Sequence, residues 1–171
     1  MAEDGYFPIQ TISGAASSYT FTNIPNTFTA LTLRGEADTS AATLYSYTIE
    51  MRINNDSSST YNYSVLRGED GGAPEGYITT GTGSAGFLVV PGGNFNGGVV
   101  FEMDIYGYSN PLRYTFCRTQ VGYSYKNQAN KGLAAAFGLQ WRNTADVTTL
   151  TTLNYSGLFG SDTHITLYGR K

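Results

Sequence analysis

The sequence predicts an all-β protein, a jelly-roll-like antiparallel β-sandwich of about ten strands in a single domain. Three observations support this fold class. Apolar and polar residues alternate over long stretches, which is the period of a strand with one buried face. Turn residues separate these stretches at short intervals. No window sustains a 3.6-residue apolar repeat with caps at its ends, and only at Leu133–Phe137, which has three alanines, could a helical turn compete with a strand.

The clearest alternation lies between Leu44 and Arg67. Apolar side chains occupy every second position of the run 45–53 and again of the run 61–65. Asn54-Asn55-Asp56 and several serines join the two runs. Two alternating runs joined by a polar, turn-prone segment predict a long antiparallel hairpin.

The composition suits linked β-sheets and argues against a nucleic-acid binder. Charged residues make up 13% of the 171 residues, against roughly 25% in ordinary domains. The net charge is −3 and the basic residues are dispersed, so no cationic stripe for nucleic acid is expected. The chain begins without the apolar core of a signal peptide and contains no run of membrane-spanning length, which predicts a cytoplasmic origin and no membrane contact.

At the N-terminus we expect an extended arm, residues 1–13, ahead of the sandwich domain, residues 14–171. Phe7, Pro8 and Ile9 make this segment apolar. A proline at this place fits an edge strand or an extended arm better than a central strand.

The remaining strands are expected where short apolar runs end at turn residues. The Asn23–Asn26 turn, Pro91-Gly92 and Asn110-Pro111 provide such ends. The Gly-rich, polar segment Gly68–Gly86 predicts the longest irregular loop, and Gly92–Gly98 a flexible turn. Besides the hairpin, the expected strands are Ser18–Thr22, Thr27–Gly35, Phe87–Val90, Val99–Tyr106, Leu112–Val121, Leu133–Trp141, Asp146–Leu153 and His164–Gly169.

Glu102 and Asp104 are two carboxylates that could act as a catalytic pair. They lie two residues apart on the outward face of the Val99–Tyr106 strand, hence roughly 6.5–7 Å apart, within the span of acid–base pairs in glycoside hydrolysis. A solvated strand face explains both residues, and catalysis would require burial and a perturbed pKa. We therefore predict no catalytic residue; Glu50 and Arg52 are likewise expected on a wet strand face.

The segment Gly81–Gly86 matches the pattern G-x-G-x-x-G of dinucleotide-binding proteins. That mechanism needs a helix N-terminus after the glycines to receive a pyrophosphate. Here Phe87–Val90, an expected strand, follows, so we predict no nucleotide site and no cofactor.

Three other groups have simpler structural explanations. Cys117 is the sole cysteine, which excludes an internal disulfide and a cysteine metal cluster and predicts a thiol packed in or beside a strand. His164 is the sole histidine; it alternates away from the apolar side chains of its strand, so we expect a surface or interface position and no zinc site. Asn54-Asn55-Asp56 lacks the ligand spacing of a calcium loop and predicts a turn. No metal ligands are therefore assigned.

The tyrosines leave two alternatives open. Tyr61, Tyr63, Tyr123 and Tyr125 could form an exposed platform on which a sugar stacks. They could also be core or subunit-interface residues, because an amphipathic ring gives a large contact area. The second alternative is favoured, since tyrosines at a spacing of two in a strand normally face inward.

A set of segments, in this order, resembles the β-sheet virion proteins of tailed bacteriophages, a group of capsid decoration (cement) and minor structural or tail proteins. The resemblance extends from about Tyr19 to Lys171 and leaves residues 1–13 outside. The segments are Ser18-Tyr19-Thr20-Phe21, Ile24–Gly35, Met51–Asp56, Asn62-Tyr63-Ser64, Leu66-Arg67-Gly68 and Ile165–Lys171.

The resemblance implies a non-enzymatic virion protein. We expect a capsid decoration protein that binds the outer surface of the major capsid protein as a homo-oligomer, with a trimer as the favoured state. Its assembly is expected in the host cytoplasm. Phe7, Pro8 and Ile9 are the expected contacts to a neighbouring subunit or the capsid. The resemblance implies no catalytic residue, cofactor or metal.

Two alternatives remain beside the decoration protein. The chain could be a tail or fibre component, or a carbohydrate-binding module that acts alone or as a receptor-binding head with a surface glycan as partner. An enzyme that uses Glu102 and Asp104 is the third possibility.

Overall fold

The computed structural model describes residues 5–39, 47–69, 72–90, 98–124, 132–154 and 157–171. These residues form twelve strands and no helix, so none of them belongs to a helix long and apolar enough to cross a membrane. The strands are β1 (Tyr6–Ser13), β2 (Ser18–Phe21), β3 (Ala30–Ala37), β4 (Tyr47–Ile53), β5 (Tyr61–Glu69), β6 (Glu75–Thr82), β7 (Ala85–Val90), β8 (Val99–Tyr106), β9 (Thr115–Ser124), β10 (Gly132–Trp141), β11 (Leu150–Leu153) and β12 (His164–Arg170).

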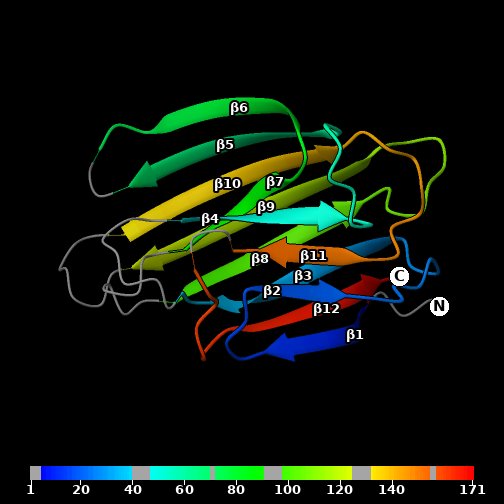
Figure 1. Ribbon diagram of the computed structural model, residues 1–171, viewed down its shortest axis with the longest axis horizontal. Helices are drawn as coiled ribbons and strands as arrows, with labels where there is room; N and C mark the ends of the chain where they lie inside the picture. The colour runs from blue at the N-terminus through cyan, green and yellow to red at the C-terminus, as the bar shows by residue number, and fades with distance from the viewer. Residues whose placement is uncertain (1–4, 40–46, 70–71, 91–97, 125–131, 155–156) are drawn as a thin grey trace.

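Two antiparallel sheets face each other across one core (Figure 1). The large sheet has eight strands in the order β1-β12-β3-β8-β9-β10-β5-β6, and the small sheet has four in the order β2-β11-β4-β7. The predicted all-β sandwich is confirmed, although with twelve strands.

The order of strands is that of a jelly roll with two insertions. Strands β1-β12-β3-β8 of the large sheet face β2-β11-β4-β7 of the small sheet. The chain crosses between the sheets at β1–β2, β2–β3, β3–β4, β4–β5, β6–β7, β7–β8, β10–β11 and β11–β12. Two interleaved Greek keys of this kind define the jelly roll. The hairpin β5–β6 is inserted between β4 and β7, and the pair β9–β10 between β8 and β11. Both insertions join the large sheet and double its width.

The predicted hairpin between Leu44 and Arg67 is wrong. Strands β4 and β5 lie in different sheets: β4 pairs with β11 and β7, whereas β5 pairs with β10 and β6. Asn54 and Asn55 do form the expected turn, with φ of 51° and 54°, and the Asp56 N–H donates to the Ile53 carbonyl at 2.9 Å. The chain then crosses the end of the sandwich. An alternating pattern reports a buried face, and two strands that face each other show it as well as two that pair.

The predicted loop Gly68–Gly86 is also wrong. Within it, Glu75–Thr82 forms strand β6, which pairs with β5 along its length. The segment escaped prediction because it is rich in Gly and Thr and has no buried face: six of its eight residues are exposed. The predicted turn Gly92–Gly98 falls almost wholly on residues that the structure does not describe.

Alternation correctly identified the core positions of β8, β10 and β12. Val99, Phe101, Met103 and Ile105 of β8 are buried, as are Ile165 and Leu167 of β12. In β10 every second residue from Leu133 to Trp141 is buried. Across the sheets the ring of Phe87 in β7 meets that of Phe101 edge to face, with centroids 5.9 Å apart. Burial of these side chains is the main stabilising term of the fold.

The N-terminal segment forms an edge strand, one of the two arrangements that Pro8 fits. Strand β1 pairs with β12 and has a bulge between Pro8 and Gln10. Phe7 stacks on Phe28 with ring centroids 6.1 Å apart, and Ile9 packs against the core. The described part of residues 1–13 is therefore attached to the large sheet.

Candidate functional site on the outer face of the large sheet

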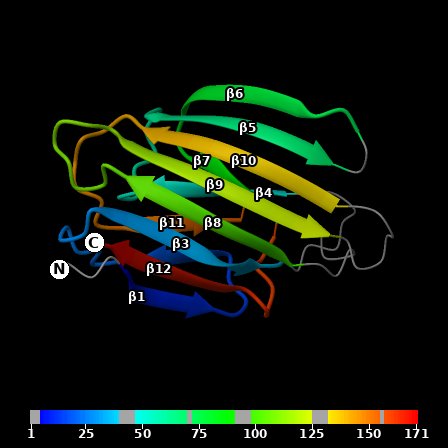
Figure 2. The ribbon, with the colours of Figure 1, turned by 180° about the vertical axis from the view of Figure 1, so that it is seen from behind.

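The outer face of the eight-stranded large sheet is turned away from the small sheet, and Figure 2 shows the molecule from this side. Residues opposite one another on paired strands share a face of the sheet. One row across the outer face is Thr166, Arg34, Glu102, Gln120, Ala136 and Leu66; the next is Tyr168, Thr32, Asp104, Arg118, Gly138, Ser64 and Ile78. The rows change from charged at β3 and β8 to apolar at β5 and β6.

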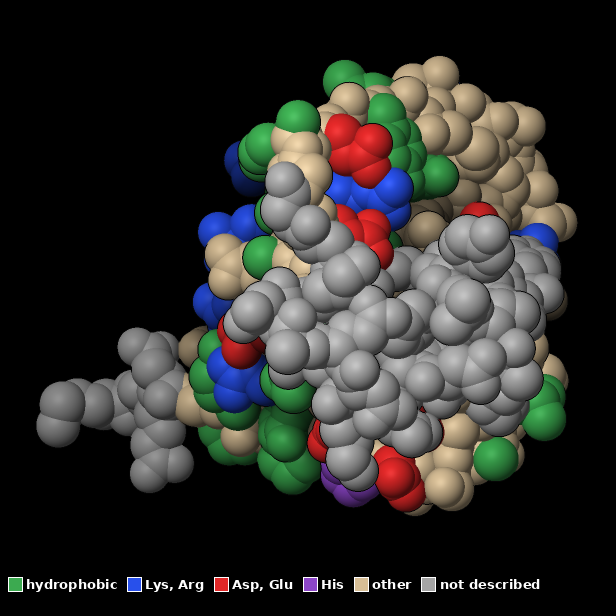
Figure 3. Space-filling view, turned by 90° about the vertical axis from the view of Figure 1, so that its left-hand side faces the viewer, with side chains coloured by type: hydrophobic (Ala, Val, Ile, Leu, Met, Phe, Trp, Pro, Cys, Tyr) green, Lys and Arg blue, Asp and Glu red, His purple; other side chains and the backbone are tan. Residues whose placement is uncertain are grey.

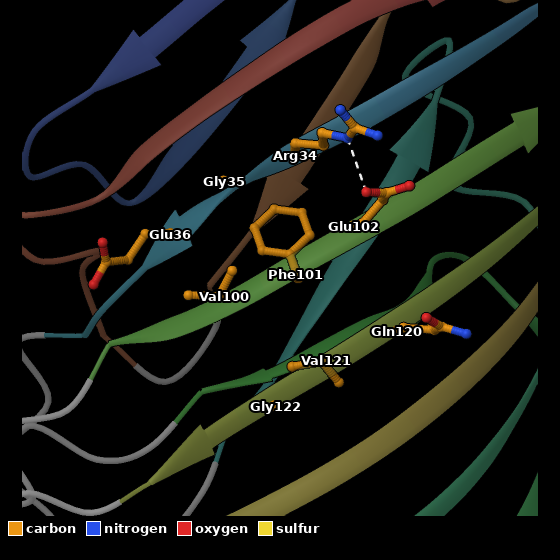
Figure 4. Close-up of a pocket in the computed structure, with 9 residues that line it drawn as sticks. All are labelled: Arg34, Gly35, Glu36, Val100, Phe101, Glu102, Gln120, Val121 and Gly122. Atoms are coloured by element: carbon orange, nitrogen blue, oxygen red, sulfur yellow. Dashed lines mark ion pairs between the residues drawn. The ribbon is translucent and has the colours of Figure 1, made fainter.

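The charged half is the part of the outer face that carries Arg34, Glu102, Asp104, Arg118 and Arg170. It contains an ion pair beside a shallow hollow. Arg34 in β3 and Glu102 in β8 lie opposite each other and form an ion pair, with Nε and Oε2 2.8 Å apart (Figure 4). The Arg34 guanidinium also lies 3.9 Å from the centre of the Tyr6 ring, a cation–π contact with the edge strand β1. The hollow of about 730 Å³ continues over Val100, Gln120 and Gly122, while Glu36 is directed away from the ion pair (Figure 4).

Asp104 joins four strands at the centre of this half. Its carboxylate accepts hydrogen bonds from Thr32 at 3.1 Å and Tyr106 at 3.2 Å, and forms ion pairs with Arg118 at 3.1 Å and Arg170 at 2.9 Å. The prediction that Asp104 faces solvent is wrong, because these side chains cover it and leave 6% of it exposed. Glu102 is exposed as expected.

This geometry does not suit an acid–base pair. Burial alone would raise the pKa of Asp104, but the hydrogen bonds from Thr32, Arg118 and Tyr106 and the positive charge of Arg170 outweigh it and lower the pKa. A general acid needs a raised pKa to keep its proton near neutral pH. Asp104 instead holds two arginines in place, and Glu102 is engaged by Arg34.

The other half of the outer face carries no charge between Arg118 and the β6 edge. It is an apolar strip made of Phe116 in β9, Ala136 and Gly138 in β10, Leu66 in β5 and Ile78 in β6. Leu66 is 63% exposed and Ile78 is 76% exposed. Large apolar side chains exposed next to one another are typical of surfaces that meet a partner.

A second, aromatic hollow lies at one end of the same face. It has a volume of about 730 Å³ and is lined by Phe28, Tyr106, Tyr114, Phe116 and Arg113, together with the backbone of the β8–β9 turn. The turn is fixed by the Asn110 N–H, which donates to the Gly107 carbonyl at 3.2 Å, and by the Arg113 N–H, which donates to the Asn110 carbonyl at 3.2 Å. Tyr114 and Phe116 are about half exposed, so the hollow presents rings to solvent on a rigid frame.

The remaining candidate groups occupy structural positions. Cys117 is fully buried in β9, as predicted, and burial raises the pKa of its thiol. His164 is exposed at the start of β12, as predicted. Gly81–Gly86 spans the end of β6 and the start of β7, so no helix follows these glycines. Among the described residues no group of three or more His, Cys, Asp or Glu could hold a metal ion.

For two of the four tyrosines, burial decides between an exposed sugar platform and a core position. Tyr61 is fully buried and Tyr123 is nearly so, which confirms the favoured core alternative for both. Tyr63 is partly buried and packs against the core, and Tyr125 falls outside the described residues.

The polar cluster of the charged half could not be found from the sequence. Asp104 and Arg170 are 66 positions apart, and Tyr6 reaches Arg34 from the N-terminal strand. Such contacts depend on which strands pair. The exposed aromatic pair Tyr114 and Phe116 could have been found from the sequence, because two large rings flank Thr115 just after the Asn110-Pro111 turn.

Acidic and basic side chains lie next to one another on the described part of the face that Figure 3 shows.

We found no family model that matches the chain, and no curated protein sequence or solved structure matches it either. The jelly-roll assignment therefore stands on strand order alone, and the resemblance to phage virion proteins stays a prediction from the sequence segments.

Proposed function

We propose that the chain is a non-enzymatic structural protein of a tailed-phage virion, a decoration protein that binds the outer surface of the capsid as a homo-oligomer and stabilises it. Phe7, Pro8 and Ile9 on the exposed edge strand β1 would contribute to contacts with a neighbouring subunit or the capsid.

The breadth of the large sheet's outer face is the observation that carries this proposal. Two insertions extend the jelly roll on that side only, and they supply the apolar strip that ends at Leu66 and Ile78. A rigid, wide surface with exposed apolar residues and satisfied charges is suited to adhesion, because it loses little entropy on contact. On the same face, ion pairs hold Arg34, Glu102, Asp104, Arg118 and Arg170.

The experiment that tests the proposal measures binding of the purified protein to preformed capsids that lack it. We expect saturable co-sedimentation, weakened by Leu66→Lys in the apolar strip. The matched control is Leu112→Lys, because Leu112 is even more exposed but lies in the β8–β9 turn outside the strip. Absence of binding by the unaltered protein would contradict the proposal.

The aromatic hollow favours a second candidate function, a glycan-binding module or receptor-binding head. Aromatic rings stack on the apolar faces of sugars, and Arg113, Asn110 and Thr29 beside them offer polar partners. If this is the function, soluble oligosaccharides should change the tyrosine fluorescence and Tyr114→Ala should abolish the change. Tyr77→Ala, at a comparably exposed ring in β6, is the control. No response to a broad glycan panel would remove this candidate.

A further inference from the structure

The two sheets have four edges, and three of them are closed to further strands. Strand β1 is interrupted by Pro8, which lacks an N–H, and by a bulge. Strand β2 has four residues. All six residues of β7 are buried, because the large sheet lies against it. Proline, bulges, short strands and coverage are the devices by which proteins prevent a sheet from adding strands.

Strand β6 lacks all of these devices except a bulge at one end. It is eight residues long and contains no proline, lysine or arginine. Its bulge with β5 lies at its far end, between Tyr61 and Asn62 of β5. Its one charged side chain, Glu75, is already paired with Arg67 of β5. Both ribbon views place β6 at the rim of the large sheet with no described strand beyond it (Figures 1 and 2).

An open edge of this kind presents unpaired backbone N–H and C=O groups that another strand can satisfy. Ile78, at the middle of β6, is 76% exposed on the outer face. A strand added beside β6 would cover one side of this side chain and extend the apolar strip. The edge therefore offers both backbone hydrogen bonds and apolar contact.

Elimination indicates which strand would pair with the open edge of β6. A foreign strand would need a sequence that the edge selects, and the uncharged middle of β6 offers no charge to select one. Between copies of this chain, the partner edge must also be open, and among the described edges only β6 is. Two identical edges pair antiparallel about a two-fold axis, with Ile78 and Thr79 near the axis and Glu75 of each copy at the ends.

We propose that β6 pairs antiparallel with β6 of a second copy, so that the two large sheets become continuous across a two-fold symmetric dimer. A ring of three copies would require β6 to meet a different edge, and those edges are closed. Eight-residue pairing makes a small interface, so the dimer forms reversibly with concentration. The inference does not depend on capsid binding, and either can fail without the other.

Hydrogen exchange across a concentration series tests the edge directly. The mass in solution, measured by light scattering, should rise from one chain to two as the concentration increases. Over the same range the β6 amides that are not hydrogen-bonded to β5 should gain protection by about tenfold or more, because pairing closes their access to water. The amides of β1, at the opposite edge, should not change.

Three variants separate edge pairing from other contacts. Ile78→Lys puts two positive charges near the axis and should abolish the dimer. Val100→Lys, at a 66% exposed residue of the same face in β8, should leave it intact. Leu66→Lys, one strand inside the edge, should also leave it intact, and loss of the dimer there would instead indicate face-to-face stacking.

The proposal is overturned by a protein that stays monomeric at all concentrations, by a trimer, or by β6 exchange rates that do not depend on concentration. The exchange measurement uses the unaltered protein, so it decides the question even where a variant fails to fold.

Discussion

The carboxylate of Asp56 connects the end of β4 to the end of β10. It accepts hydrogen bonds from Trp141 Nε1 at 2.8 Å, from the Ser58 N–H at 2.9 Å and from Thr60 Oγ1 at 2.9 Å. Burial alone would raise the pKa of Asp56, but the hydrogen bonds from Ser58, Trp141 and Thr60 outweigh it and lower the pKa to about 2. The charged carboxylate is therefore part of what fixes the crossing between the sheets.

Asp56→Asn should lower the free energy of unfolding at pH 7 by about 1–2 kcal/mol, a figure reduced for partial exposure. The pKa is lower in the folded chain than in the unfolded one, so this contribution is complete above about pH 4 and is lost as the pH falls towards 2. Urea unfolding of both proteins between pH 7 and pH 2 checks this.

The difference between the native protein and Asp56→Asn should therefore shrink as the pH falls. Asp162→Asn, at an exposed residue, is the control and should have little effect at any pH. A difference that stays constant down to pH 2 would contradict the role assigned to the Asp56 carboxylate.

At the scale of elements, Tyr61 fixes where the chain passes from β4 of the small sheet to β5 of the large sheet. Its ring is fully buried. Its hydroxyl accepts a hydrogen bond from the Ile53 N–H at 2.8 Å, and its oxygen lies 3.2 Å from each of the Ile53 and Asp56 carbonyls, to which it can donate. The first residue of β5 thus holds the last residue of β4, although the two strands belong to different sheets.

Tyr61→Phe should lower the free energy of unfolding by about 1–3 kcal/mol, because it removes the hydroxyl that the buried Ile53 N–H needs. Chemical denaturation of both proteins measures the difference. Tyr77→Phe, which removes a hydroxyl from a more exposed ring, should change stability by less than about 0.5 kcal/mol. Equal effects at the two positions would show that the Tyr61 hydroxyl does not hold the crossing.

The same elements show what the sequence could predict. The buried faces of β8, β10 and β12 follow from period-two alternation, which is local. The partners of a strand are not local: β4 and β5 show matching patterns and yet join different sheets. Strand β6 lacked a signal because an edge strand with both faces partly exposed need not alternate. Asp104 lies on the outer face, as its position in the alternation predicts, but its burial depends on arginines from β9 and β12.

At the scale of the whole molecule, the two insertions explain why the apolar strip and the open strand edge lie on the same half of the large sheet. A four-strand sheet would end at β8, close to the Asp104 cluster. The added strands β9, β10, β5 and β6 carry the apolar strip and the open edge. The proposed attachment to a capsid and the proposed pairing of copies both use this half of the sheet, whereas the core beneath it accounts for stability.

The most direct test of the proposed function heats bare capsids and capsids saturated with the protein and compares the temperatures at which they rupture. We expect the protein to bind at a fixed number of copies per capsid and decorated capsids to rupture at a higher temperature than bare ones. A protein that does not bind, or that binds without changing the rupture temperature, would contradict the proposed function.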